Sequence, residues 1–251
     1  MYRTPSLTQT LVPSSTTLVA HWTGKRRPPV AKRRDSVLPH CLFSPIHYEP
    51  GYAYPLIVWL HGPESSELEL QQVMPMVSVR NYVGVAPRGT CRTSKTERLY
   101  TWRQTAGDVA DACQRVVDCV DLARDQYNIH ADRIFVAGYG DGGTMALRVG
   151  MEHPELLAGA ISLGGRVPRG GNAFRRINSA RRLPLLLSVA PTEGQYSNQQ
   201  IKEDLRLLHS GGFPLSLQLY AGKDEPLVED MFWDLDAWVM EQFCPSAVTA
   251  S

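Results

Sequence analysis

Short apolar segments that alternate with helical patterns constrain the fold of this 251-residue chain more than any other feature. The clearest is PLIVWLHG, Pro55–Gly62, a continuous run of β-forming residues that is typical of a strand buried on both faces. Further strands are predicted at Tyr82–Ala86, Ile134–Ala137, Ala158–Leu163, Leu185–Val189 and Leu215–Tyr220. Strands of this kind belong to parallel sheets whose two faces are covered by helices.

Helical patterns fill the intervals between these strands. Ala106–Arg124 places its apolar residues at the i, i+3, i+4 spacing of an amphipathic helix. Further helices are predicted at Gly142–Glu152, Gln199–His209 and Leu227–Gln242. The alternation predicts an α/β fold with a mostly parallel central sheet, helices on both faces and right-handed crossovers. In such a fold the functional site is expected in the loops at the carboxyl ends of the strands.

Charge is distributed unevenly along the chain. Residues 1–36 hold seven Lys/Arg and one acid (+6), and the remainder holds nineteen Lys/Arg and twenty-four acids (−5), which together give the net charge of +1. The basic stretch Lys25–Arg34 is also rich in proline and lacks apolar periodicity. We therefore predict a disordered basic Ser/Thr/Pro-rich tail at 1–36, a folded α/β domain at 37–245 and a flexible C-terminus at 246–251. The tail is interpreted as a solvated extension, with weak contact to an anionic surface as the alternative.

The composition excludes several classes of protein. The five cysteines are scattered and lack CxxC spacing, which argues against a disulfide framework or zinc site and favours a reducing, cytoplasmic location. No apolar run is long enough to span a membrane, and no signal peptide is recognisable. The glycine-rich segment Gly138–Gly143 lacks both a Walker-A lysine and full Rossmann spacing. We expect no cofactor, no metal and no specific nucleic-acid partner, and the oligomeric state is left open.

Two stretches carry a family resemblance: RIFVAGYGDGGTMALRVGMEHPELLAGAISLGG, Arg133–Gly165, and YEPGYAYPLIVWLHG, Tyr48–Gly62. They resemble the phospholipase/carboxylesterase group of the α/β-hydrolase superfamily, including its feruloyl-esterase-like and dienelactone-hydrolase-like members. The resemblance implies an α/β-hydrolase fold with a nucleophilic serine on a sharp G-x-S-x-G turn. Here the turn reads Gly-Tyr-Gly-Asp-Gly, so Gly140 stands at the nucleophile position. Without a side chain it cannot form an acyl-enzyme.

The other family positions also depart from the pattern. The resemblance implies a histidine base after the last strand, where this chain has no histidine and Asp224 stands instead. An aspartate, with a pKa near ~3.9, is a poor general base for a hydroxyl. Glu193 occupies the acid position, with no imidazole to orient. In the oxyanion loop, His61-Gly62 is followed by Pro63, which has no N–H to donate.

Several alternatives remain open. Asp141 becomes the nucleophile if the register shifts by one residue, although it also suits the N-terminus of the following helix. His61 is interpreted as a loop-packing residue, and a site that combines it with Ser65 or Ser66 has no supporting spacing. Two charged loops are interpreted as solvated, although the second could meet an anion: Lys223, Asp224 and Glu225, and Gly164–Ala180 with Arg166, Arg169, Arg175 and Arg176.

The sequence thus predicts a catalytically degenerate α/β-hydrolase that acts in binding or interaction, with a small-molecule or acyl-ester-like ligand in the residual cleft. The expected binding residues are His61, Gly62, Pro63, Tyr139, Gly140 and Asp141. The alternative is an active carboxylic-ester hydrolase that uses Asp141 and Glu193.

Overall fold

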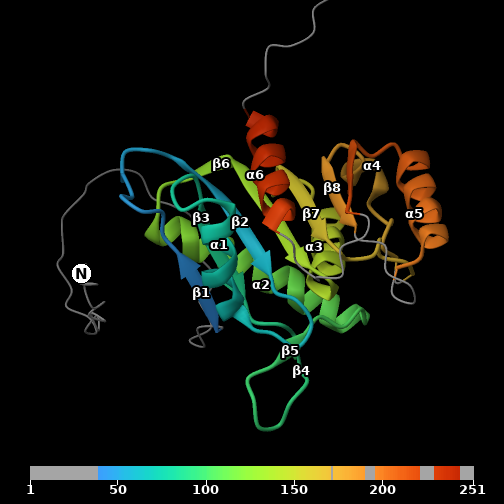
Figure 1. The fold of residues 1–251 in the computed structure, drawn as a ribbon, viewed down its shortest axis with the longest axis horizontal. Coiled ribbons are helices and arrows are strands. Elements are labelled where there is room, and N and C mark those ends of the chain that lie inside the picture. The colour runs from blue at the N-terminus through green and yellow to red at the C-terminus, as the bar shows by residue number, and fades with distance from the viewer. Residues whose placement is uncertain (1–38, 171, 190–195, 221–228, 244–251) are drawn as a thin grey trace, which may run out of the picture. The chain divides into compact units, whose positions relative to one another are not determined.

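A mixed sheet, drawn as arrows in Figure 1, forms the centre of the domain. The computed structural model describes residues 39–170, 172–189, 196–220 and 229–243. Within them the strand order is β1-β3-β2-β6-β7-β8-β9, and every neighbouring pair is parallel except β1 with β3. The strands are β1 (His40–Phe43), β2 (Tyr54–Leu60), β3 (Val83–Pro87), β6 (Ile129–Tyr139), β7 (Gly159–Leu163), β8 (Leu185–Val189) and β9 (Leu215–Leu219). The predicted α/β class with a mostly parallel sheet is confirmed.

Helices follow most of these strands. They are α1 (Leu70–Val77), α2 (Ala106–Gln126), α3 (Asp141–Glu152), α4 (Ile177–Ala180), α5 (Asn198–Ser210) and α6 (Glu229–Phe243), with a 3₁₀ turn η1 (Glu67–Glu69) before α1. A two-stranded ribbon, β4 (Cys91–Arg92) and β5 (Tyr100–Thr101), lies outside the main sheet. The Thr105 hydroxyl caps α2, and Ser197 with Gln200 forms a capping box on α5, which fixes where these helices begin.

The two faces of the sheet hold separate apolar cores. On β2, Leu56, Val58 and Leu60 belong to the core that also holds residues of α2, α3 and α5, and the alternate residues Ile57 and Trp59 belong to the core that holds residues of α1 and α6. This alternation is the two-residue period of a strand. Figure 1 shows α1 and α6 on one side of the sheet and α2 and α3 on the other. The sheet is therefore covered on both faces, as its continuous apolar runs predict.

Most predicted elements coincide with observed ones. Strand β8 matches its prediction at both ends, and α2 and α3 begin within one residue of theirs. Strand β6 begins at Ile129, ahead of the predicted Ile134, because its first residues are polar or partly exposed and carry no apolar signal. Helix α1 was not predicted, and Pro75 in its interior explains why, since proline lacks the N–H of a regular helix. Strand β1 is too short to show a pattern.

The described residues cover only part of the predicted domain limits. The internal contacts divide the chain after Val37, and the predicted tail 1–36 and C-terminus 246–251 lie outside the described residues. Among the described helices none has the length and apolar character required to cross a bilayer. The described cysteines are all free thiols: Cys41, Cys91, Cys113 and Cys119.

Strand register brings three loops together at one edge of the sheet. Leu60 lies beside Gly138 in the pairing of β2 with β6, and Tyr139 lies beside Leu163 in the pairing of β6 with β7. The chain therefore leaves these three strands at the same level. This is the carboxyl edge at which the sequence predicts the site.

Candidate functional site

A sharp turn joins β6 to α3 at Gly140. This residue has φ 54° and ψ −118°, a backbone conformation that residues with a β-carbon rarely adopt. Its N–H donates to Leu163 O at 2.9 Å, and its carbonyl accepts from Thr144 N–H at 3.0 Å. The turn is thus tied both to the neighbouring strand β7 and to the first turn of α3. Asp141, the next residue, already belongs to the helix.

The glycines around this turn are required by close backbone approach. A β-carbon on Gly138 would lie 2.6 Å from Leu60 O, and one on Gly142 would overlap the carbonyl oxygens of Leu60 and His61. The loop after β2 therefore packs directly on the start of α3, with no room for side chains between them. The turn keeps the narrow geometry that its glycine spacing predicts.

Position 140 faces the loop after β2. A β-carbon built on Gly140 lies 3.1 Å from Cδ and 3.7 Å from Cγ of Pro63, the contacts within 4 Å that the described residues make beyond its chain neighbours. A side chain at the turn would therefore start against the Pro63 ring. The backbone at Gly140 would place and orient a nucleophilic side chain, but glycine supplies no nucleophilic atom.

His61 is held inside the loop by both of its ring nitrogens. Gly89 N–H donates to Nε2 at 2.9 Å, so Nε2 carries a lone pair and the proton resides on Nδ1, which lies 2.8 Å from Gly62 O. The ring is fully buried and packs against Trp102 at 5.2 Å. Burial lowers the pKa of His61, which keeps the imidazole neutral. Neither nitrogen is available to a substrate hydroxyl.

A carboxylate of the protein itself occupies the amide next to His61. Gly62 N–H donates to Glu69, 3.0 Å from Oε1 and 3.2 Å from Oε2, and the indole N–H of Trp59 donates to the same Oε1 at 2.9 Å. The following residue, Pro63, is exposed and has no N–H. Neither Gly62 nor Pro63 therefore offers a free amide to an oxyanion.

The two side chains that flank Gly140 have different surroundings. The half-buried Tyr139 ring lies against Gly62 and Gly164, since β-carbons on these glycines would lie 2.7 and 3.3 Å from it. Burial raises the pKa of Tyr139. Asp141 is exposed, and its Oδ2 accepts from the Thr101 hydroxyl at 2.9 Å. This bond links the turn to the ribbon β4–β5.

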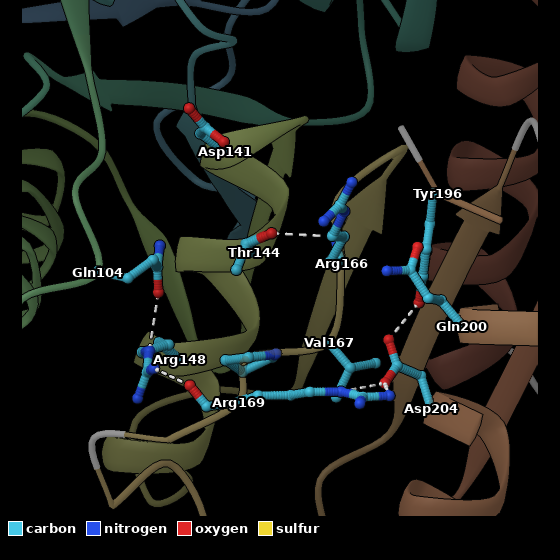
Figure 2. A pocket seen from close by; sticks show the side chains of 11 residues that line it. Gln104, Asp141, Thr144, Arg148, Arg166, Val167, Arg169, Tyr196, Gln200 and Asp204 are labelled. Atoms are coloured by element: carbon cyan, nitrogen blue, oxygen red, sulfur yellow. Dashed lines mark hydrogen bonds and ion pairs between the residues drawn. The ribbon is translucent and has the colours of Figure 1, made fainter. Parts of the chain in front are cut away.

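A pocket of about 320 Å³ opens beside α3, next to the turn (Figure 2). Asp141, Thr144 and Arg148 project into it from α3 at helical spacing. The remaining walls come from Gln104, from the loop after β7 and from the α5 region. The lining residues are Gln104, Asp141, Thr144, Arg148, Arg166, Val167, Pro168, Arg169, Tyr196, Gln200 and Asp204. Most of these residues have polar or charged side chains, and three of them are arginines.

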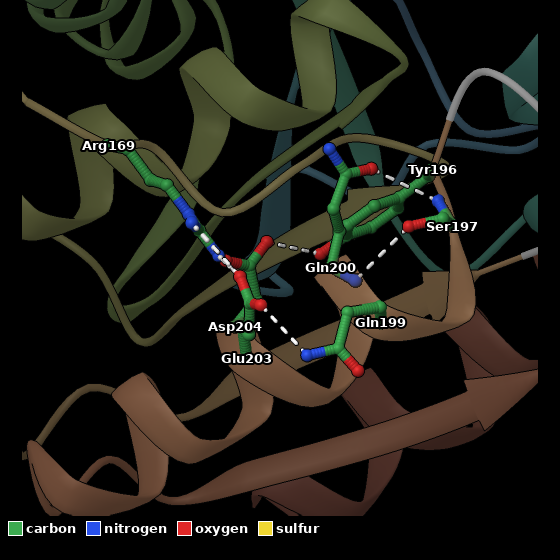
Figure 3. A network of polar contacts seen from close by, with 7 residues as sticks. All are labelled: Arg169, Tyr196, Ser197, Gln199, Gln200, Glu203 and Asp204. Atoms are coloured by element: carbon green, nitrogen blue, oxygen red, sulfur yellow. Dashed lines mark hydrogen bonds and ion pairs between the residues drawn. The ribbon is translucent and has the colours of Figure 1, made fainter.

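Residue Asp204 organises the α5 wall of this pocket, as Figure 3 shows. The carboxylate is almost fully buried and accepts from the Tyr196 hydroxyl at 2.6 Å and from Arg169 Nε at 2.9 Å. Burial and this carboxylate raise the pKa of Tyr196 well above the usual range. The network fastens the loop after β7 to α5 and gives the pocket a fixed wall.

Comparison with known proteins agrees with the fold described above. Residues 94–190 match the Phospholipase/Carboxylesterase family. A rice (Oryza sativa subsp. japonica) protein named probable carboxylesterase is 25% identical over 112 residues, which are 44% of this chain and 42% of the rice protein. The chain thus spans less than half of that relative.

Solved structures share the fold. Arabidopsis thaliana SOBER1 matches with a TM-score of 0.63 at 18% identity, over 76% of this chain and 99% of that one. The Bacillus cereus carboxylesterase matches with a TM-score of 0.62 at 17% identity, over 83% and 96% of the two chains. The domain has the α/β-hydrolase fold, and its residues 94–190 match the phospholipase/carboxylesterase group.

In this α/β-hydrolase the remaining family positions have different outcomes. The predicted acid Glu193 and base-position Asp224 lie outside the described residues, as do Lys223 and Glu225. Ser66 caps the 3₁₀ turn, where its hydroxyl accepts from Leu68 N–H, and Ser65 pairs through its backbone with Tyr100. Both nitrogens of His61 are already bonded, so the geometry offers no partner for either serine.

The basic loop after β7 of the α/β-hydrolase divides into two parts. Arg166 and Arg169 line the pocket, whereas Arg175 pairs with Glu152 and Arg176 with Glu155 on the surface. Sequence reasoning therefore named two pocket arginines but did not recognise that they face a cavity.

Other pocket residues were missed altogether. Arg148 is 3% exposed although it lies on an apolar helix face, and a charged residue amid that apolar periodicity is the signal that could have found it. Tyr196 and Asp204 gave no such signal. In the described part of the chain no group of three His, Cys, Asp or Glu side chains could hold a metal ion.

Proposed function

We propose that this α/β-hydrolase has lost serine-esterase activity and acts by binding a small ligand in the cleft beside the turn. The observation that carries the proposal is the residue at the turn. Gly140 holds the strained backbone of a nucleophile position and presents no side chain. The fold alone does not decide function, because activity belongs to the site.

The loss of kcat expected from the missing groups favours a protein without esterase activity over a weakened esterase. In a well-studied serine protease, loss of the nucleophile alone costs about 10⁶ in kcat. Loss of one oxyanion donor costs roughly 10²–10³. Here the nucleophile is missing, Pro63 has no N–H, and Gly62 N–H is engaged by Glu69. These losses do not add, but the first is sufficient.

The family relationship supports the alternative of an active carboxylic-ester hydrolase, since a relative bears a carboxylesterase name. Asp141 is its best nucleophile, because the side chain is exposed, lines the pocket and lies next to the turn. In that mechanism Glu193 would assist. Against it, Asp141 has a helical backbone, and the nucleophile conformation belongs to Gly140.

Hydrolysis of short-chain p-nitrophenyl esters separates the two functions. We expect the purified full chain to release p-nitrophenol at the rate of buffer with an unrelated protein. Asp141→Ala and Glu193→Ala should not change this rate, and Asp132→Ala, at an exposed aspartate outside the pocket, is the matched control. Turnover well above background that disappears in Asp141→Ala but not in Asp132→Ala would establish the hydrolase instead.

The expected cytoplasmic location also remains a proposal. It is supported by the free thiols of the described cysteines, which suit a reducing compartment. Fluorescence microscopy of the tagged full chain tests it, and recovery in a secreted or organellar fraction would contradict it.

A further inference from the structure

The three arginines of the pocket differ in the groups that their guanidinium groups contact. Arg169 is paired with Asp204 at 2.5 Å and with Glu203 at 3.3 Å. Its charge is therefore balanced inside the wall of the pocket. Arg148 and Arg166 lie nearer α3 (Figure 2), and they give the pocket its positive charge.

Arg166 directs its guanidinium at the pocket without an ion-pair partner. Its backbone N–H donates to Thr144 Oγ1 at 2.9 Å, and its guanidinium carbon lies 5.9 Å from the centre of the Tyr196 ring. Among the described residues no carboxylate pairs with this side chain, which is exposed to solvent in the pocket. Its fork of N–H donors is therefore open to a ligand, and a guanidinium matches the two oxygens of a carboxylate or phosphate.

Arg148 adds a buried positive charge below Arg166. The oxygens to which its guanidinium donates include Gln104 Oε1 at 2.8 Å, Gly170 O at 3.1 Å and Arg169 O at 3.2 Å, and the Glu152 carboxylate acts on its charge from farther away. Burial lowers its pKa, but an arginine stays protonated in proteins. Because the site is shielded from water, its field acts on the pocket with less screening than that of a surface charge.

Thr144 completes the donors on α3. Its oxygen already accepts from Arg166 N–H, so its hydroxyl proton can be donated to a ligand. Two carboxylates oppose an anion here. Asp204 is neutralised by Arg169, whereas Asp141 is exposed and accepts a hydrogen bond from the Thr101 hydroxyl.

We propose that this pocket binds the oxyanion of a small carboxylate or phosphate through Arg166 and Thr144, with Arg148 stabilising the bound charge. This inference deepens the proposed binding function and rests on it. The charged and polar side chains of the lining and the volume of about 320 Å³ suit a small anionic ligand rather than a long acyl chain. Asp141 sets the limit of affinity at the rim by like-charge repulsion.

Isothermal titration calorimetry at low salt tests the site, with inorganic phosphate and butyrate in separate arms. We expect saturable binding of at least one anion by the full chain. Arg166→Gln should weaken it about tenfold, as expected for loss of a charge-assisted hydrogen bond. Asp141→Asn should strengthen it a few-fold. The arm that binds identifies the anion as phosphate-like or carboxylate-like.

The control is Arg182→Gln, which removes the same charge from an exposed arginine outside the pocket. It also accounts for anion binding by the basic residues of 1–36, which all variants share. Circular dichroism melting of each variant shows that the fold is kept, and Arg166→Lys supplies a second variant with the charge retained and the fork lost. Equal weakening in Arg166→Gln and Arg182→Gln, or no binding in either arm, overturns the proposal.

The two proposals fail separately. Ester hydrolysis by the wild-type chain would overturn the loss of activity and leave the anion site standing. Absence of anion binding together with absence of hydrolysis would overturn the anion site alone.

Discussion

A β-carbon on Gly140 would lie 3.1 Å from Cδ of Pro63. The two residues that most clearly depart from an esterase thus face each other across one gap. A serine introduced at the turn would meet a proline ring where the fold ordinarily offers an amide. Restoring one side chain therefore does not restore the site.

Gly140→Ser is accordingly expected to remain inactive. His61 cannot serve its Oγ as a base, since both ring nitrogens are bonded within the loop. The positive φ and the contact with Pro63 should lower stability by about 1–2 kcal/mol. Urea unfolding and a fluorophosphonate probe measure the two effects. Gly140→Ser/Pro63→Gly is the control, because it relieves the contact and returns an N–H; rapid labelling of the single variant would reveal a base elsewhere.

The glycines of the turn should be far more sensitive than a glycine in open surroundings. A β-carbon on Gly142 overlaps two backbone oxygens, so Gly142→Ala should cost at least about 2 kcal/mol. Gly107, near the start of α2, has no atom within 4 Å of its would-be β-carbon, and Gly107→Ala should stabilise by up to ~1 kcal/mol. Comparison of their urea midpoints tests both. Equal effects would contradict the packing of the loop after β2 on α3.

The sequence predicted the sheet well because buried strands carry their own apolar signal. Leu185–Val189 is buried at every residue and was located at both ends. The turn was recognisable in the sequence because close backbone contacts require glycine at its positions. Interactions between distant side chains gave no such signal. The bonding of Glu69 to Gly62 and of Tyr196 to Asp204 depends on chain packing, and neither partner is unusual in its own segment.

Stability should depend on pH through His61. Burial lowers its pKa below the ordinary 6.5, so the unfolded chain binds a proton that the folded protein resists. Protonation of His61 therefore leaves the free energy of unfolding unchanged well above pH 6.5. Below pH 6.5 it lowers the free energy of unfolding progressively, until the pH reaches the lowered pKa of the folded protein. Urea unfolding between pH 7.5 and pH ~5 should show a decline that is smaller in His61→Gln. His209→Gln, at an exposed histidine, is the control and should retain the full decline.

Tyr196→Phe should loosen the wall of the pocket. Removal of the hydroxyl deprives the buried Asp204 carboxylate of a 2.6 Å hydrogen bond, which should cost about 1.5–3 kcal/mol. Tyr52→Phe, at a tyrosine that is 48% exposed, should be nearly neutral. Thermal melts of the two variants provide the measurement. A Tyr196→Phe variant as stable as Tyr52→Phe would show that Arg169 alone satisfies the carboxylate.

The Glu69 carboxylate on Gly62 N–H has a consequence for any ligand that enters the cleft. It is a competitor tethered to the chain, and tethering gives it an effective concentration on the order of millimolar or more. A free anion at micromolar concentration cannot displace it. An anion at this edge of the sheet is therefore expected to bind the guanidinium of Arg166, as proposed above, rather than the Gly62 amide of the loop after β2.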